Sequence, residues 1–341
     1  MSFKKQYSDY FFSFSAIFFM GLIISAPKVC AAGAQKGLML CSGALIPALF
    51  PFAVPVLFLI NTSAFKSINK KCLALFLLSL IGGYPIGAKL ICELCKSNQL
   101  SKETARKILP FYINAGPAFI IVAVGKGLLG SVMLGYILFA SHIASSVIIS
   151  AALIPHYILS NNQNKLPNKS LSLSDNFVLS IKGATDACIS ICAFVIFFSV
   201  VNEYVLHFSQ GFKPLSILLY FTEVTSAVKQ SGNIYVISFL LGFSGISIWM
   251  QVLFVSENIK PNIAVFSAVR IIHGLLSVLI TTAIIRIFKI SVPTFSNNTT
   301  LQSKFTYSSL ALSFSLLIMV IVLLINIVSK KHSGNIIKDM I

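Results

Sequence analysis

The sequence contains few charged residues for its length. Among 341 residues, 26 are Lys or Arg and 9 are Asp or Glu, so only 10% carry charge. Soluble proteins contain roughly 25% charged residues. Hydrophobic residues make up 56% of the chain, and the mean hydropathy is +0.89. The available charged side chains cannot cover a soluble fold of this size. The composition therefore excludes a cytosolic enzyme, a secreted module and a disordered tail, and it predicts a protein embedded in a lipid bilayer.

Acidic residues are especially scarce, which leaves a formal net charge of +17. In a soluble protein this charge would suggest nucleic-acid binding. In a membrane protein, Lys and Arg collect in cytoplasmic loops under the positive-inside rule, and this explanation is the simpler one here. We therefore expect no nucleic-acid partner. The same excess of positive charge favours a small anionic substrate.

Motifs that would indicate an enzyme, a disulfide framework or a metal centre are missing. The seven cysteines are odd in number and lie mostly in apolar stretches, so a disulfide framework is not expected. Residues 92–95 form a lone CxxC, and the five histidines lie at no metal-ligand spacing. HExxH, GxSxG and P-loop patterns do not occur. The sequence therefore predicts a protein that is not an enzyme and has no cofactor apart from a coupling Na⁺ or H⁺.

About ten apolar segments approach the roughly 20 residues that a membrane-spanning helix requires. The first follows Lys4 and Lys5 and precedes small residues at 30–34, a layout shared with signal peptides. Its length favours a first spanning helix, although retention of residues 1–30 stays open. The segments are 10–28, 37–61, 72–92, 108–126, 130–154, 183–207, 214–228, 233–256, 262–289 and 307–328.

Three of these segments differ from simple spans. Residues 81–87 place Gly-Gly-Tyr-Pro-Ile-Gly at the centre of segment 72–92, and residues 242–245 place Gly-Phe-Ser-Gly at the centre of segment 233–256. Segment 214–228 is short. Gly and Pro break helices, and lipid cannot satisfy the backbone groups that a break releases. Such breaks lie beside a cavity or pack against a neighbouring helix, and we expect a cavity.

The flanking charges give these segments an orientation. Basic clusters at 66–71 and 96–107 flank segment 72–92, and both stay cytoplasmic if the segment enters and returns as a re-entrant hairpin. Segments 214–228 and 233–256 then form a second hairpin from the opposite side. We aligned residues 81–88 with residues 241–248 on this basis. Two repeats of opposite orientation with broken helices are the layout of many secondary transporters.

These observations predict an all-α polytopic membrane protein with about 8–10 membrane segments, in two inverted repeats with re-entrant helical hairpins. The expected parts are an N-terminal membrane helix (1–36), a first repeat (37–155), a polar cytoplasmic linker (156–176), a second repeat (177–290) and a C-terminal membrane helix with a tail (291–341).

Ionisable residues at membrane depth are costly and usually face a cavity, so they are candidate site residues. Lys89 follows the first break and either faces the site or extends to the interface. Arg270 and His273 share one face of segment 262–289, because residues three apart lie together on a helix. Glu223 and Thr225, in an acidic and hydroxyl-rich stretch, suit a coupling cation or a proton.

Other candidates are uncharged. Pro117 interrupts segment 108–126 and frees carbonyl groups, while a half-helix that starts there would direct its positive end at an anion. Ser247 and Gln251 lie near the second break, where they either bind substrate or bond to a neighbouring helix. The complete predicted substrate-binding set is Gly83, Tyr84, Pro85, Gly87, Lys89, Asn114, Gly116, Pro117, Ser244, Ser247, Gln251, Arg270 and His273.

Five stretches resemble a known family. They are residues 82–89 (Gly-Gly-Tyr-Pro-Ile-Gly-Ala-Lys), 100–105 (Leu-Ser-Lys-Glu-Thr-Ala), 114–120 (Asn-Ala-Gly-Pro-Ala-Phe-Ile), 223–226 (Glu-Val-Thr-Ser) and 273–277 (His-Gly-Leu-Leu-Ser). Together they resemble the YlbJ-type sporulation integral membrane proteins, which carry nucleoside-recognition (Gate) domains. The resemblance covers roughly residues 30–290. The family pattern has a glycine where this chain has Ala227.

The resemblance implies a transporter related in plan to concentrative nucleoside carriers. It also implies the cell membrane or outer forespore membrane of a spore-forming bacterium, and import of dipicolinate toward the forespore. We therefore expect alternating-access transport of a small anion, with dipicolinate as the substrate that the resemblance names. Two alternatives remain: a nucleoside or other small-solute carrier on the same fold, and a non-transporting scaffold that recruits a sporulation membrane partner.

Overall fold

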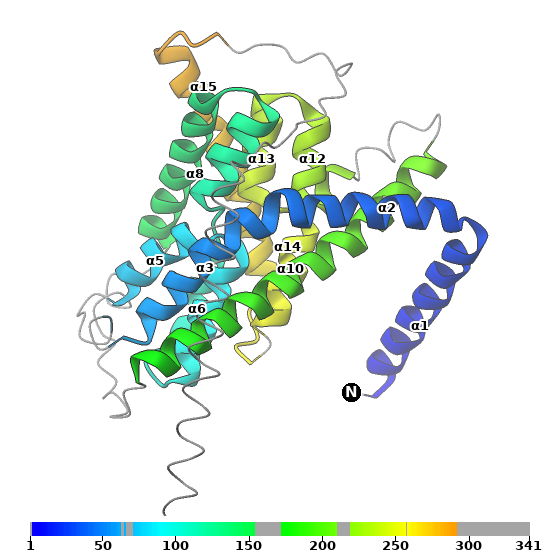
Figure 1. The fold of residues 1–341 in the computed structure, drawn as a ribbon, viewed down its shortest axis with the longest axis horizontal. Helices are drawn as coiled ribbons and strands as arrows, with labels where there is room; N and C mark the ends of the chain where they lie inside the picture. Colours follow the sequence, from blue (N-terminus) through cyan, green and yellow to red (C-terminus); the bar gives the residue numbers. More distant parts are fainter. Residues whose placement is uncertain are drawn as a thin grey trace, which may run out of the picture. The chain divides into compact units, whose positions relative to one another are not determined.

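The computed structural model describes residues 2–62, 65, 71–153, 172–209, 219–256 and 258–291. Every regular element in these ranges is helical, which confirms the all-α prediction (Figure 1). The elements are α1 Ser2–Ser25, α2 Pro27–Leu40, η1 Cys41–Leu45, α3 Ile46–Ile60, α5 Lys71–Gly82, α6 Tyr84–Lys96, α7 Lys102–Ile108, η2 Leu109–Phe111, η3 Ala118–Leu128, α8 Val132–Leu153, α10 Leu173–Phe208, α12 Val224–Ser231, α13 Ile234–Phe243, α14 Gly245–Val255 and α15 Ile263–Ile287.

Four helices in the described part are long and apolar enough to cross a membrane, as expected for an integral membrane protein. A fifth span is formed if the bent pair Ser13–Ser25 and Pro27–Gly43 counts as one. The four are Val132–Ala152, Leu173–Phe208, Ile234–Val255 and Ile263–Ile287. Residues 292–341, and with them the predicted C-terminal membrane helix, lie outside the described residues.

The N-terminal helices meet at Pro27, where the chain bends by 101°. Proline has no N–H to donate, so it suits the first turn of a new helix. From there the chain stays helical through α2, η1 and α3 to Ile60. The predicted boundary between residues 36 and 37 therefore falls inside α2. The tyrosine hydroxyl of Tyr204 bonds to the carbonyl groups of Leu22 and Ala26 at 3.1 and 3.0 Å, which ties the bend to α10.

Helix α2 lies against α10 (Figure 1). A Cβ added at Gly33 would lie 2.6 Å from the Val200 Cα, and one added at Gly37 would lie 2.7 Å from the Ile196 Cα. Glycines four residues apart let two helix backbones approach this closely in a membrane. This contact explains why α2 continues across the predicted boundary.

The predicted linker, residues 156–176, overlaps the start of α10. Residues 154–171 lie outside the described part of the chain. The Ser172 hydroxyl caps α10 by accepting a 3.1 Å hydrogen bond from the Asp175 N–H, so the last residues of the predicted linker are helical.

Two interruptions of the first half touch each other. Gly83 separates α5 from α6 with φ at 85°, a left-handed conformation that glycine adopts readily. A non-helical stretch, residues 112–116, separates η2 from the helical turn at Pro117 that leads into η3. A Cβ at Gly116 would lie 3.2 Å from the Ile81 carbonyl oxygen and 3.5 Å from the Gly83 Cα. The two breaks therefore cross at close range.

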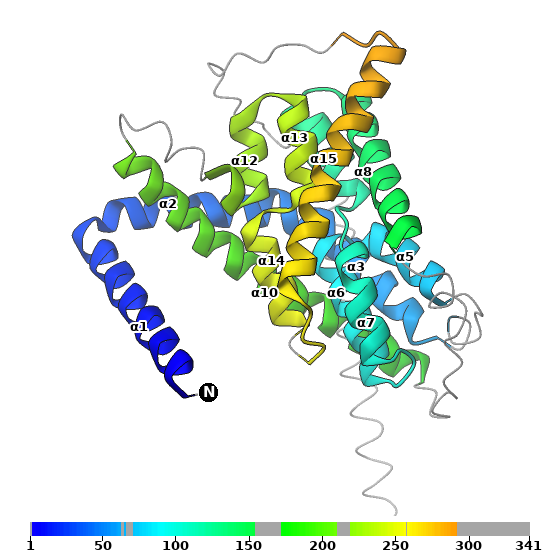
Figure 2. The same ribbon diagram turned by 180° about the vertical axis from the view of Figure 1, so that it is seen from behind.

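A second pair of interruptions occurs in the second half. Glu223 separates a helical turn at 219–222 from α12, and Ser244 separates α13 from α14. Ser244 and Gly245 have φ values of 76° and 79°. A Cβ at Gly245 would lie 3.2 Å from the Val224 nitrogen and 3.5 Å from the Thr222 carbonyl oxygen. Helices α13, α15 and α8 lie side by side beyond this crossing (Figure 2).

Candidate functional site

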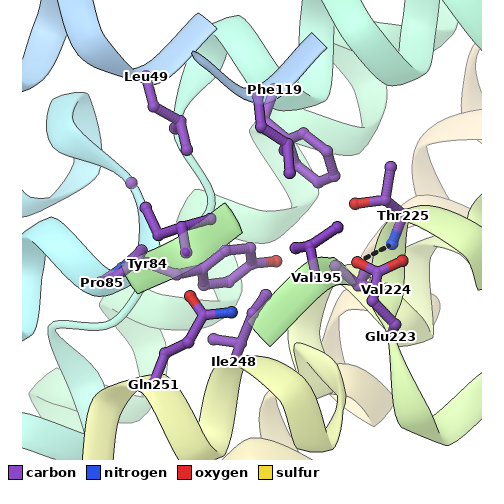
Figure 3. Close-up of a pocket in the computed structure, with 14 residues that line it drawn as sticks. Leu49, Tyr84, Pro85, Phe119, Val195, Glu223, Val224, Thr225, Ile248 and Gln251 are labelled. Atoms are coloured by element: carbon purple, nitrogen blue, oxygen red, sulfur yellow. Dashed lines mark hydrogen bonds between the residues drawn. The ribbon is translucent and has the colours of Figure 1, made fainter. Parts of the chain in front are cut away.

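A pocket lies beside these breaks, three of which contribute to its lining (Figure 3). The ring of Tyr84 extends into its middle, with Leu49 and Phe119 on one side and Ile248 and Gln251 on the other. Helices from both halves of the sequence therefore build one cavity. The lining residues are Leu45, Leu49, Gly83, Tyr84, Pro85, Gly116, Phe119, Ile191, Val195, Glu223, Val224, Thr225, Ile248 and Gln251.

Three helices begin at this pocket: α6 starts at Tyr84, η3 at Ala118 and α12 at Val224, and each places a residue of its first turn in the lining. Helix α14 starts at Gly245, outside the lining, and reaches the pocket with Ile248 and Gln251. The N-terminal end of a helix carries a partial positive charge and has N–H groups without a partner within the helix. Three such ends direct their partial positive charge toward the pocket.

The polar side chains of the lining come from the breaks. Glu223 is 2% exposed, and its Oε1 accepts a 2.9 Å hydrogen bond from the Thr225 N–H (Figure 3). Gln251 donates through Nε2 to the Ser247 Oγ at 3.3 Å, while its Oε1 is buried with no partner in the described part of the chain. Among the lining residues Glu223 is the one charged side chain, and neither Lys nor Arg is present.

Behind the pocket, a buried polar network joins the two halves. Arg270 on α15 is 0% exposed. Its Nη1 donates to the Ile113 carbonyl oxygen at 2.6 Å, and its Nη2 donates to the Ser244 Oγ. The Tyr84 hydroxyl donates to the Leu241 carbonyl oxygen at 2.6 Å. The bonds to Ile113 and Leu241 link the first half of the chain to the second.

Two histidines extend this network along α8 and α15. The His142 Nε2 accepts a 3.0 Å hydrogen bond from the Ala115 N–H, so that nitrogen carries no proton. The His273 Nε2 lies 3.0 Å from the His142 carbonyl oxygen, which can only accept, so His273 donates there. The ring centroids are 4.5 Å apart. Both imidazoles hold backbone positions, and neither lines the pocket.

The predicted site residues fall into three groups. Gly83, Tyr84, Pro85, Gly116, Glu223, Thr225 and Gln251 line the pocket. Behind them lie the polar network and its neighbours at the breaks: Asn114, Pro117, Ser244, Ser247, Arg270 and His273.

The third group is Gly87 and Lys89, which lie apart from the lining. Gly87 packs against the Tyr112 carbonyl group, where a side chain has no room. The Lys89 Nζ donates to the Gly183 carbonyl oxygen at 2.7 Å and so links α6 to α10.

His142 is the main residue that the sequence did not single out. It lies in α8 with Ser141, Ser145 and Ser146, and all four are buried. A cluster of polar residues inside an apolar span is a recognisable pattern. Its partner, the Ala115 N–H, lies 27 residues away in sequence, and no spacing rule connects the two.

Comparison with known proteins adds no relative. No family model, no curated protein and no solved structure matches this chain. Within the described residues, no three His, Cys, Asp or Glu side chains gather where they could hold a metal ion. The functional argument therefore depends on the pocket itself.

Proposed function

We propose that this protein is a membrane carrier that binds a small anionic solute in the pocket and moves it by alternating access. One observation carries the proposal: three helix N-termini, two from the first half of the sequence and one from the second, lie at a single cavity beside one buried carboxylate. Helix N-termini bind anions without a basic side chain. In carriers built from repeats, substrate sites lie between the repeats at such broken helices.

The order of elements supports the inverted-repeat arrangement within this proposal. Each half begins with a long helical stretch, continues with two breaks that touch each other, and ends with a further long helix. In the first half the stretch is α2–α3 and the last helix is α8; in the second half they are α10 and α15. This order pairs Gly83 with Glu223 and Gly116 with Ser244. It replaces the sequence alignment of residues 81–88 with residues 241–248, which joined the first break of one half to the second break of the other.

The composition of the pocket wall supports movement of one set of helices along another. Helices η1, α3 and α10 contribute Leu45, Leu49, Ile191 and Val195, which are all apolar. The breaks and the helices that follow them contribute every polar lining residue. An apolar wall offers few directional bonds, so the helices that carry the breaks can slide along it with the solute.

Two hydrogen bonds of the described side chains cross from this wall to the breaks. Besides the Lys89 bond, the Thr222 hydroxyl donates to the Asn202 Oδ1 at 2.6 Å. We propose that both bonds break and re-form during the transport cycle.

Glu223 is the proposed coupling residue, with Thr225 beside it. A carboxylate buried in an apolar cavity is stabilised by a proton or a cation, and the solute brings its own negative charge. Dipicolinate, a flat dianion, is the first solute to test because the family resemblance names it. The same resemblance proposes the cell membrane or the outer forespore membrane as the location.

A second candidate is a carrier of nucleosides or other uncharged solutes. The lining favours it in one respect: it contains a carboxylate, an amide and a tyrosine, and it has neither Lys nor Arg. A non-transporting scaffold remains the third candidate. For that function the segments 93–107 and 156–176 would matter more than the pocket.

The test is uptake by the purified protein in liposomes, with labelled dipicolinate and a labelled nucleoside in parallel. Val195→Trp fills the cavity from α10 without altering a polar group, and Ile189→Trp places the same ring on the exposed face of that helix. We expect Val195→Trp to abolish uptake of dipicolinate and Ile189→Trp to retain it. Uptake of the nucleoside alone would favour the second candidate. Absence of any uptake by folded protein would favour the scaffold.

A further inference from the structure

Arg270 places a permanent positive charge between two of the four breaks, residues 112–116 and Ser244. It is completely buried, and no carboxylate of the described chain lies within 4.0 Å of it. Burying an unpaired guanidinium costs several kcal/mol by order of magnitude, so the surroundings must stabilise the charge. In this structure the guanidinium group of Arg270 lies beside the C-terminal ends of two helices.

The helices α7–η2 and α13 both end beside Arg270. The C-terminal end of a helix carries a partial negative charge, and its last carbonyl groups have no partner within the helix. In carriers with broken helices, such carbonyl groups and helix ends are where coupling Na⁺ ions bind. Here Arg270 bonds to the Ile113 carbonyl oxygen after one helix and to the Ser244 hydroxyl after the other.

Three other carbonyl groups at these two ends already have protein donors. Asn114 and Ser146 donate to the Phe111 carbonyl oxygen at 3.1 and 3.2 Å. At the end of α13, Tyr84 donates to the Leu241 carbonyl oxygen and Trp249 donates to that of Phe243 at 2.8 Å. An ion that entered would have to displace these bonds as well as the guanidinium.

We infer that Arg270 is a resident cation that takes the place of a coupling Na⁺ ion between the two breaks, so that the protein neither binds nor requires Na⁺ there. The inference rests on the proposed carrier function and refines it. With this position occupied by Arg270, Glu223 remains as the coupling group and a proton as the ion it takes. Arg270 is then a positioning residue that holds the breaks in place, since it is not among the residues that line the pocket.

The first measurement uses the wild-type protein and needs no substrate. The apparent Tm of the purified full chain is recorded in NaCl and in choline chloride at equal ionic strength. A bound ion stabilises the folded state, so Na⁺ at about 100 times its dissociation constant would raise Tm by several degrees. We expect equal Tm values in the two salts. A higher Tm in NaCl would overturn the inference and would leave the proposed carrier function standing.

The second measurement uses chemical rescue. Arg270→Ala removes the cation and leaves a cavity of guanidinium size at the helix ends. We expect a lower Tm than wild type, restored in part by about 10 mM guanidinium chloride, which is far below denaturing concentrations. Arg286→Ala, an exposed arginine on the same helix, is the matched control and should respond to neither change.

If Arg270→Ala does not fold, Arg270→Lys keeps the charge with different geometry and gives the same comparison. The lysine variant should fold, and its Tm should be equal in NaCl and choline chloride. Failure of guanidinium to raise the Tm of folded Arg270→Ala would overturn the inference, as would an Arg270→Lys variant stabilised by Na⁺. Uptake in choline medium tests the consequence for transport separately.

Discussion

Helices α13 and α15 pack closely at Gly242. Replacing Gly242 with alanine adds one methyl group and so tests this contact. A Cβ at Gly242 would lie 2.5 Å from the Gly274 Cα and 2.6 Å from its nitrogen. Ordinary contact begins near 3.4 Å. In Gly242→Ala the two backbones must therefore separate by roughly 1 Å, because neither atom belongs to a side chain that can rotate away.

This separation acts on the site as well as on packing. Ser244 follows Gly242 by two residues, and Arg270 precedes Gly274 by one helical turn. The hydrogen bond from Arg270 to Ser244 joins α15 to the residue that follows α13. The 2.8 Å hydrogen bond between Ser238 and Thr281 also joins these two helices. Overpacking costs about 1–3 kcal/mol, and stretched buried hydrogen bonds add to it.

We expect the apparent Tm of Gly242→Ala to fall by about 2–10 °C, at roughly 2–4 °C per kcal/mol. Thermal unfolding of the purified protein, followed by intrinsic fluorescence, measures this. Gly21→Ala is the matched control, since a Cβ there meets no atom within 4 Å. If the two alanine variants have the same Tm, α13 and α15 do not pack at this distance, and the position assigned to Arg270 is wrong.

Three further predictions follow from the site and the α2–α10 contact. Tyr84→Phe leaves the buried Leu241 carbonyl oxygen without its donor, so Tm should fall by the equivalent of about 1 kcal/mol in thermal unfolding; an unchanged Tm would mean that this bond is not made. Glu223→Gln removes the one carboxylate of the pocket lining, so uptake driven by an imposed proton gradient should be lost; uptake equal to wild type would assign coupling to another residue. Gly37→Leu places a side chain against the Ile196 backbone, so α2 should separate from α10, with a lower Tm and faster cleavage in limited proteolysis; resistance equal to wild type would contradict the contact.

The breaks were recognisable in the sequence because their residue types act locally. Glycine and proline favour helix breaks, and Gly83 and Gly116 do lie at irregular backbone beside the pocket. These residue types alone do not fix a break, because Pro51 and Pro55 lie inside α3. Glu223 was recognisable for a similar reason, because a carboxylate in an apolar stretch has few stable environments.

The role of each charged residue was less accessible. The sequence predicted both Arg270 and Lys89 as substrate-binding residues. In the structure, Arg270 lies between two helix ends, whereas Lys89 bonds to the Gly183 carbonyl group on α10. The pairing of breaks was also ambiguous, because Gly-rich stretches resemble one another regardless of which break they form. His142 had no sequence signal that linked it to the Ala115 N–H.

The sequence by itself determined that the chain is helical and embedded in a membrane, and where its helices break. These properties follow from composition and from residue types that act on their own backbone. Tertiary structure decided which breaks touch, which helix N-termini open on the pocket, and that Arg270 faces two C-terminal helix ends. Those relations depend on contacts between segments up to about 160 residues apart, such as Tyr84 with Leu241. Spacing along a chain cannot specify such contacts, because they arise only when the helices pack together.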